Sequence, residues 1–226
     1  MPSDHDAGSA RSEDTKKAKS NDVMQRLGKS QNSSNPSDEE VFKLAPFNPS
    51  SDQIQKMALD MLQLGPSDVL FDLGCGDGRF LCYAANQIPG LKCVGLEIDA
   101  EFVSRGRDKV TKSQLQDRVD VRLEDATKAG DENTSSGTDQ STTPEKIVQL
   151  LTLMEDATAL YLFILPKGIV KMMPILNALK QKRLAEGKRF KVLSYMFKIR
   201  EWEPTIVDET AKGSCPVYYY DIGGPE

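Results

Sequence analysis

Two patterns of hydrophobic and polar positions follow one another along the chain. Short apolar or alternating runs indicate strands, and apolar residues at helical spacing indicate helices. The pattern predicts strands at 68–73, 91–99, 118–123, 157–166, 190–197, 206–209 and 217–221. It predicts helices at 54–64, 79–87, 100–113, 144–154 and 168–182. Strands that alternate with helices favour an α/β fold with a mostly parallel sheet, here with an antiparallel strand at its close.

Two segments lack the apolar residues that a core requires. Residues 1–40 are rich in Ser, Asp, Asn and Lys, and we expect a disordered tail. The folded domain is predicted to span 41–226, interrupted by a flexible inserted loop at 127–143. Ser50, Ser51 and Asp52 can each cap the first helix, and segment 46–51 is predicted to lie near the glycine turn, either as a structural elbow or as a lid.

The first strand runs into a glycine turn with the sequence Asp-Leu-Gly-Cys-Gly-Asp-Gly. Its glycines permit positive φ and a close approach of a ligand to the backbone, and the next helix directs free N–H groups at the turn. The dinucleotide fingerprint places its third glycine three residues after the second, but here the distance is two. Asp72 would repel a pyrophosphate and attract a cationic amino-acid ligand. The pattern resembles motif I of the class I, seven-strand S-adenosylmethionine (SAM) methyltransferases.

Acidic residues also end the second and third predicted strands. Glu97 lies about twenty residues after the turn, where Rossmann-like units bind ribose hydroxyls, and the alternative is a solvated strand-end acid. The methyltransferase resemblance implies that Glu124 or Asp125 meets the adenine amino group, with Asp125 favoured by register. The resemblance gives these cofactor-binding residues: Asp72, Gly74, Cys75, Gly76, Asp77, Gly78, Glu97, Ile98, Asp125 and Ala126.

Several further motifs resemble one methyltransferase subgroup over about 46–222. They are Pro-Phe-x-Pro-Ser at 46–50, Gly-x-Glu-Ile-Asp at 95–99, Leu-Tyr-Leu at 160–162 with a proline at 166, and Trp-x-Pro at 202–204. These are similar to the small seven-strand lysine methyltransferases that act on the ATP synthase c subunit and the adenine nucleotide translocase, and to their bacterial relatives. The resemblance implies a Rossmann-like sheet, SAM as cofactor and a protein lysine as methyl acceptor.

The chain departs from this subgroup at several points. Cys75 stands where the subgroup usually has Ser, and Tyr195-Met196 replaces a His-Asp pair of bacterial members, so no general base is assigned. The apolar targeting segment of the mitochondrial members is not found. We therefore expect an intracellular, cytoplasmic location, with a mitochondrial one suggested by the resemblance alone.

Aromatic faces attract an ammonium group, which makes Phe47, Tyr161 and Trp202, together with Pro166, candidates for the wall of a lysine channel. Each is equally well explained by core packing, so both interpretations stay open.

The composition narrows the function further. The 226 residues are 38% hydrophobic, enough for one domain with a core, and the net charge of −5 gives nucleic acid no broad basic surface. The four cysteines form no Cys-x-x-Cys pair and His5 is the only histidine, so we expect no metal site and reduced thiols. No apolar run approaches the ~20 residues of a membrane span.

Three hypotheses follow for the function. The first is a protein-lysine methyltransferase, the second a methyltransferase for a small molecule, and the third a non-catalytic SAM-binding module.

Overall fold

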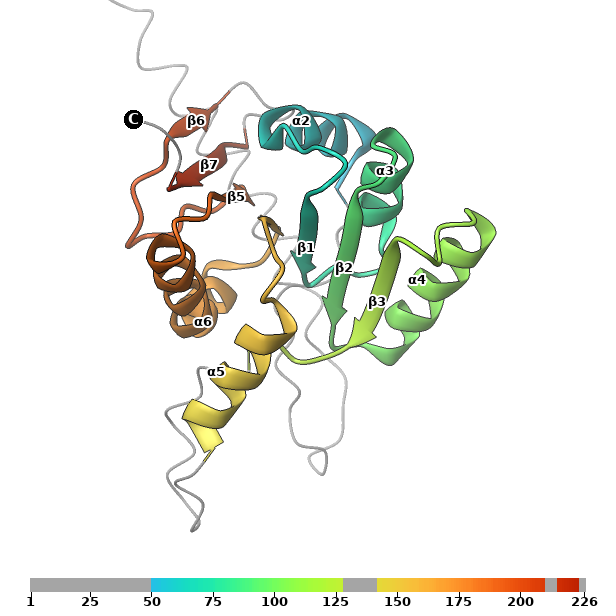
Figure 1. Cartoon of the computed structure of the whole chain (residues 1–226). Coiled ribbons are helices and arrows are strands. Elements are labelled where there is room, and N and C mark those ends of the chain that lie inside the picture. Colours follow the sequence, from blue (N-terminus) through green and yellow to red (C-terminus); the bar gives the residue numbers. More distant parts are fainter. Residues whose placement is uncertain (1–49, 128–141, 210–214, 224–226) are drawn as a thin grey trace, which may run out of the picture.

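The sheet has seven strands in the order β3-β2-β1-β4-β5-β7-β6 (Figure 1). The computed structural model describes residues 50–127, 142–209 and 215–223. The first five strands pair in parallel, whereas β7 is antiparallel to both β5 and β6. This confirms the predicted α/β, mostly parallel sheet with an antiparallel closing strand. The strands are β1 Val69–Leu73, β2 Lys92–Glu97, β3 Val119–Leu123, β4 Ala159–Leu162, β5 Phe190–Tyr195, β6 Ile206–Asp208 and β7 Val217–Ile222.

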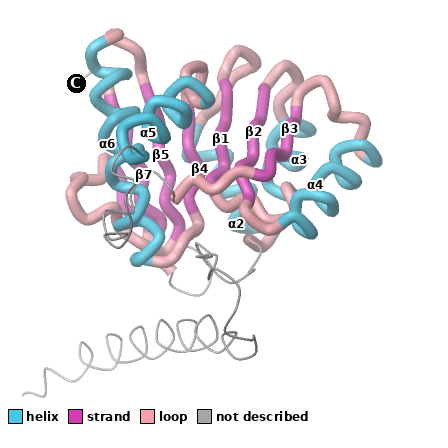
Figure 2. Tube along the Cα trace, turned by 90° about the horizontal axis from the view of Figure 1, so that it is seen from below, coloured by secondary structure: helices cyan, strands magenta, loops and turns pink. Residues whose placement is uncertain are grey.

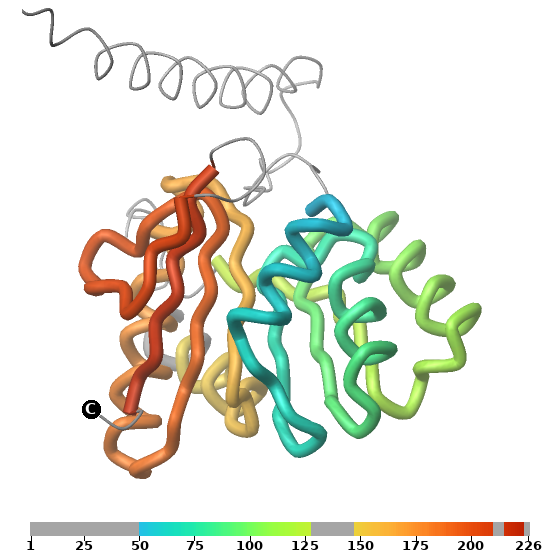
Figure 3. The backbone as a smooth tube through the Cα atoms, turned by 90° about the horizontal axis from the view of Figure 1, so that it is seen from above, coloured from blue at the N-terminus to red at the C-terminus, as the bar shows by residue number. Residues whose placement is uncertain are grey.

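Helices cover both faces of the sheet and create two hydrophobic cores (Figures 2 and 3). Helices α2, α3 and α4 lie on one face, and α5 and α6 lie on the other. Because β1 to β5 are parallel, their carboxyl ends meet at one edge, which is where α/β sheets bind ligands. The helices are α2 Asp52–Leu62, α3 Arg79–Gln87, α4 Ala100–Lys112, α5 Thr142–Leu153 and α6 Pro166–Ala185.

The strand register places Asp72 and Tyr161 next to each other in one row across the sheet. Asp72 on β1 is the partner of Gly95 on β2 and of Tyr161 on β4, and Tyr161 is in turn the partner of Leu193 on β5. Neighbours in a parallel register point to the same face. All four therefore belong to the face that α2, α3 and α4 cover.

The structure shifts several of the predicted boundaries, and two of these shifts bear on the site. The expected strand 157–166 is shorter, because Pro166 occupies the first turn of α6, where its missing N–H removes no hydrogen bond. Thr127 is buried and bonded to Asp125, so it does not belong to the inserted loop. The remaining loop residues up to 141 lie outside the described residues, as do the predicted tail and the rest of segment 46–51 before Ser50. Ser51 is the residue that caps α2.

The middle of β2 must be glycine for the turn after β1 to pack against it. A Cβ atom at Gly95 would lie 2.5 Å from Sγ of Cys75 and 2.7 Å from Cδ1 of Leu81. Real contacts of that length do not occur, so Gly95 allows the glycine turn and the start of α3 to lie directly on β2. The Cys75 side chain is buried in this contact.

Replacing Gly95 by Ala is therefore expected to push the glycine turn away from β2. We expect Gly95→Ala to lower the free energy of unfolding by about 2–3 kcal/mol, as for other overpacked cores, in a urea titration. Gly65→Ala is the matched control, since its Cβ would have Oδ2 of Asp68 as its nearest neighbour at 3.8 Å. Equal stability of the two variants would contradict this account of Gly95.

Candidate functional site

Backbone hydrogen bonds hold the glycine turn against β2. The N–H groups of Gly74 and Cys75 both donate to the carbonyl oxygen of Leu96, at 2.8 and 3.2 Å. Gly74, Gly76 and Gly78 all have positive φ, at 85°, 55° and 66°. The predicted left-handed turn is present, and it is fixed from the neighbouring strand rather than only by its own residues.

Glu97 joins this turn to the one that follows β2. Its Oε2 accepts the N–H of Gly76 at 2.8 Å, and its Oε1 accepts the N–H groups of Ile98 and Asp99 at 2.9 and 3.0 Å. A carboxylate has about four acceptor sites, so these three bonds leave room on Oε2 for a further donor. The side chain is only half-buried. It can therefore support the turn and still receive a hydroxyl group of a ligand.

Asp72 is a buried carboxyl group, and none of the described cations pairs with it. Its exposure is 4%, and no described residue gives it a hydrogen bond or an ion pair. Burial, together with the negative charge of Glu97, raises the pKa of Asp72 well above its usual value. Such a group is costly to ionise in the protein alone. A ligand that brings an ammonium group to it would supply the missing counter-charge.

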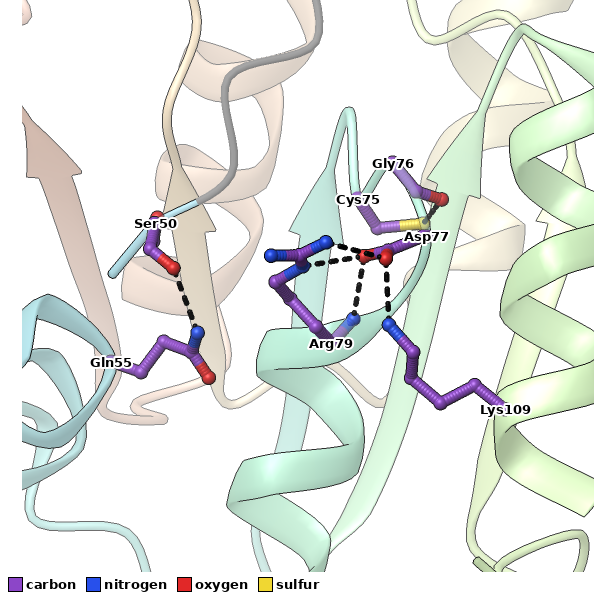
Figure 4. A network of polar contacts seen from close by, with 7 residues as sticks. All are labelled: Ser50, Gln55, Cys75, Gly76, Asp77, Arg79 and Lys109. Carbon is purple, nitrogen blue, oxygen red and sulfur yellow. Dashed lines mark hydrogen bonds and ion pairs between the residues drawn. The ribbon is translucent and has the colours of Figure 1, made fainter. Parts of the chain in front are cut away.

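Asp77, five residues later, is in the opposite situation. Its carboxylate accepts Nε and Nη2 of Arg79 at 2.9 and 2.8 Å and Nζ of Lys109 at 2.6 Å (Figure 4). Burial opposes its ionisation, but the hydrogen bonds from Arg79 and Lys109 hold its pKa down, at about 2. The side chain is fully engaged within the protein. A ligand could therefore contact Asp77 through its backbone.

The two acids that end β3 differ in how well they are held. Oδ1 of Asp125 accepts both the N–H and the hydroxyl of Thr127, at 2.9 and 2.6 Å, and Ala126 beside it is buried. The side chain of Glu124 is exposed, and its backbone N–H pairs with the carbonyl oxygen of Glu97. Asp125 is the better oriented of the two. The roles of Asp125 and half-buried Ile98 in cofactor binding stay predictions.

The proposed channel residues are dispersed in the structure. Tyr161 is 2% exposed, and its hydroxyl lies 2.6 Å from Oγ of Ser50 while its ring packs on Phe80. Pro166 begins α6 at the edge of the sheet. Phe47 lies outside the described residues. Of segment 46–51, predicted to be an elbow or a lid, the structure describes Ser50, which is buried and bonded to Tyr161, and Ser51, which caps α2.

Trp202 is a core residue beneath α6. Its Nε1 donates to Oδ1 of Asn177 at 2.9 Å, its ring meets Tyr220 edge-on, and the Lys180 ammonium lies 4.8 Å above it. The structure does not bring it to the glycine turn. The packing interpretation of this residue is the one that its contacts support.

An aromatic pair that the sequence analysis missed lies nearer the carboxyl ends of the strands. Phe163 and Tyr195 follow Tyr161 and Leu193 by two residues, and their ring centroids are 4.8 Å apart. Side chains two residues apart in a strand point to the same face of the sheet. This period could therefore have identified the pair, which lies one step nearer the carboxyl edge than Tyr161 and Leu193. Met196 follows with φ of 70°, a strained conformation for a long side chain, of the kind that collects at functional sites.

Neither a candidate metal site nor a candidate membrane-spanning helix is found within 50–127, 142–209 and 215–223. No group of three His, Cys, Asp or Glu side chains gathers there as a metal site would need. No helix in these ranges has the length and apolar character to cross a membrane. All four cysteines are buried, and none of them forms a disulfide. Burial raises the pKa of the Cys75 thiol far above its usual range, which makes it unreactive.

Comparisons with known proteins find similar chains among methyltransferases. The family model described as mycolic acid cyclopropane synthetase matches residues 44–134. A protein-lysine N-methyltransferase of Saccharolobus islandicus is 26% identical over 180 residues, covering 79% of this chain and 94% of the relative. A ribosomal protein L11 methyltransferase of Shewanella amazonensis is 35% identical over 72 residues, covering 32% and 24% of the two chains.

The fold is also found in solved structures. An RNA methyltransferase from Salinibacter ruber, solved with S-adenosyl-L-homocysteine, superposes with a TM-score of 0.59 at 24% identity, covering 79% of this chain and 96% of the other. The sheet order and the antiparallel β7 are those of the class I methyltransferase fold. With the glycine turn and its acids, these similarities define the chain as a class I SAM-dependent methyltransferase.

The raised pKa of Asp72 predicts how the free energy of unfolding depends on pH. A carboxyl group whose pKa is raised in the folded state favours folding while protonated and loses that contribution as pH rises above its unfolded value, 3.8, and through its folded value. Without ligand, Asp72→Asn should therefore be more stable than the wild type at pH 8, by at least about 1 kcal/mol. Its advantage should shrink as pH falls toward 4.

Urea unfolding of both proteins between pH 4 and pH 8 measures this difference. Asp120→Asn is the control, because Asp120 is exposed at the edge strand β3. A wild type as stable as Asp72→Asn at pH 8 would show that another group compensates Asp72.

Asp125 is held by Thr127, whereas the side chain of Glu124 is exposed. This difference predicts how each residue affects the binding of SAM. Asp125→Ala should weaken binding of SAM about tenfold, the usual loss for one charge-assisted hydrogen bond, whereas Glu124→Ala should change it less than twofold. Isothermal titration calorimetry with each variant decides between them. The reverse order would assign the adenine contact to Glu124.

Proposed function

We propose that this methyltransferase transfers the methyl group of SAM to the side-chain amine of a protein lysine. The observation that carries the proposal is the extent of the similarity to the Saccharolobus protein-lysine N-methyltransferase, which covers 94% of that chain. The match therefore includes the half of the domain after β3, where we expect the substrate contacts. The Shewanella match, by contrast, is limited to 72 residues.

The residues of the site suit SAM. Asp72 would pair with the ammonium of its methionine part, and Glu97 would accept a ribose hydroxyl while it supports Gly76. The positive-φ glycines leave the backbone open to close approach, and Asp125 would accept the adenine amino group. SAM supplies a methyl group on a positively charged sulfur, which a neutral amine attacks as the carbon–sulfur bond breaks and its electrons pass to sulfur.

The protein's part in the reaction is to position the amine and to remove it from water. A lysine ammonium has a pKa of about 10.4, and it must lose a proton before it can attack. The aromatic pair Phe163 and Tyr195 provides an environment of low polarity at the sheet edge, which lowers that pKa. Burial raises the pKa of Tyr161 beyond its usual range, so its hydroxyl stays protonated and acts as a hydrogen-bond partner, not as a base.

One of the two alternatives has an observation of its own. The match to the mycolic acid cyclopropane synthetase family favours a small, apolar acceptor, but it ends at residue 134 and so covers mainly the cofactor half. A non-catalytic module would need the cofactor site alone. The likeness to the Salinibacter protein shows the fold only. Like the acceptor, the intracellular and cytoplasmic location stays a prediction.

Transfer of labelled methyl groups from SAM to an extract, separated by size, tests the proposal. We expect label in the protein fraction, located on lysine by mass spectrometry, and a loss of at least about 100-fold in Glu97→Ala, which removes a ligand contact and three backbone bonds. Glu101→Ala is the control, because that carboxylate is exposed on α4.

Each other outcome of this experiment selects a different function. Label in small molecules or in RNA would overturn the lysine proposal while it leaves the methyltransferase class intact. Tight SAM binding without any transfer would support the non-catalytic module.

A further inference from the structure

Helix α4 reaches the glycine turn through one long side chain. Lys109, in the last turn of α4, donates from Nζ to Oδ2 of Asp77 at 2.6 Å, across 32 residues of sequence (Figure 4). Arg79 approaches the same carboxylate from the first turn of α3. The Asp77 side chain thus stands between two helices and receives a cation from each.

The backbones of α4 and the turn are also in contact. A Cβ atom at Gly106 of α4 would lie 3.4 Å from the carbonyl carbon of Asp77 and 3.2 Å from Cγ1 of Val121. A Cβ atom at Gly78 would lie 3.3 Å from Cγ2 of the same valine. Glycines on both elements allow the turn to lie against α4 and β3 without side chains between them. Lys109 fastens the two elements where they touch.

Arg79 alone already provides Asp77 with a local counter-charge. It forms a two-pronged pair through Nε and Nη2, and its own N–H adds a third, longer bond of 3.3 Å. Neutralising Asp77 therefore does not require Lys109. What Lys109 adds is a connection between α4 and the turn, since Arg79 belongs to the helix that the turn itself begins.

We propose that Lys109 is a positioning residue for the cofactor, which acts through Asp77 to hold the glycine turn against α4. The turn then keeps the Gly76 N–H on Glu97 and the glycine backbone where the cofactor meets it. Lys109 itself does not contact the cofactor. The inference rests on the SAM site of the methyltransferase class and is independent of which molecule accepts the methyl group.

A mere surface ion pair would have different consequences. Exposed pairs contribute little to stability and nothing to a distant ligand. Arg105 and Glu101 form such a pair on the same helix, with 56% and 72% of their side chains exposed, against 34% and 12% for Lys109 and Asp77. Arg105→Gln is therefore the matched control for Lys109→Gln.

Calorimetric titration with S-adenosylhomocysteine provides the first measurement, since it needs no acceptor. We expect Lys109→Gln to weaken binding about tenfold, as is usual when a residue that orients a ligand-binding group is lost. Lys109→Arg should restore affinity to within about twofold, and Arg105→Gln should leave it unchanged. Because Asp77 keeps Arg79, the thermal midpoint of Lys109→Gln should fall by no more than about 3 °C.

Hydrogen exchange of the protein without ligand provides the second measurement. Amides of Gly76 to Arg79 should exchange faster in Lys109→Gln than in the wild type or in Arg105→Gln, while those of β4 and β5 stay as protected as before. Unchanged affinity together with unchanged exchange in the turn would overturn the inference. Loss of affinity that Lys109→Arg does not restore, with a large fall in thermal midpoint, would also overturn it and make Lys109 a general stabilising residue.

Discussion

The close contact between the glycine turn and β2 is the constraint on which the site depends. Two N–H groups of the turn share the carbonyl of Leu96, a third reaches Glu97, and the absence of a side chain at Gly95 lets Cys75 lie directly on the strand. A sheet edge otherwise leaves its loops free to move. Here β2, β3 and α4 fix one loop, so its backbone has a defined direction before a ligand arrives. The site is organised by backbone contacts more than by its side chains.

Asp72 and Asp77 show how one turn can use the same side chain in opposite ways. Asp77 is paired with Arg79 and Lys109 and contributes to the scaffold, whereas Asp72 is buried and has no cation partner in the part of the chain that the structure describes. The difference follows from the elements that face them. Asp77 lies at the junction with α4, which carries Lys109. Asp72 points, with Tyr161, into the apolar core under α2 and α3. A protein that bound nothing here would have little reason to keep a carboxyl group in that row.

Periodicity and turn chemistry predicted most of the fold, because local signals decide it. Helix α3 was predicted to the residue, since a glycine turn precedes it and Pro89-Gly90 closes it. The distance from the turn singled out Glu97, which the structure shows bonded to Gly76, while its contact with a ribose stays a prediction. The engagement of Asp77 could not be predicted, because it depends on which face of α4 meets the turn 32 residues earlier. Trp202 was ambiguous for the same reason. An aromatic residue near the sheet is equally suited to a channel and to a core, and only the position of Asn177 and Lys180 on α6 distinguishes them.

The lone carboxylate of Asp72 also links the lifetime of the protein to its cofactor. Burial disfavours the ionised form of this carboxyl group, and a ligand whose ammonium group pairs with it stabilises the folded state by mass action, by about 2.7 kcal/mol at a hundredfold excess over Kd. Proteases act on the unfolded fraction, which such a shift lowers about a hundredfold. The form of the protein that holds SAM would therefore be degraded more slowly than the form without it.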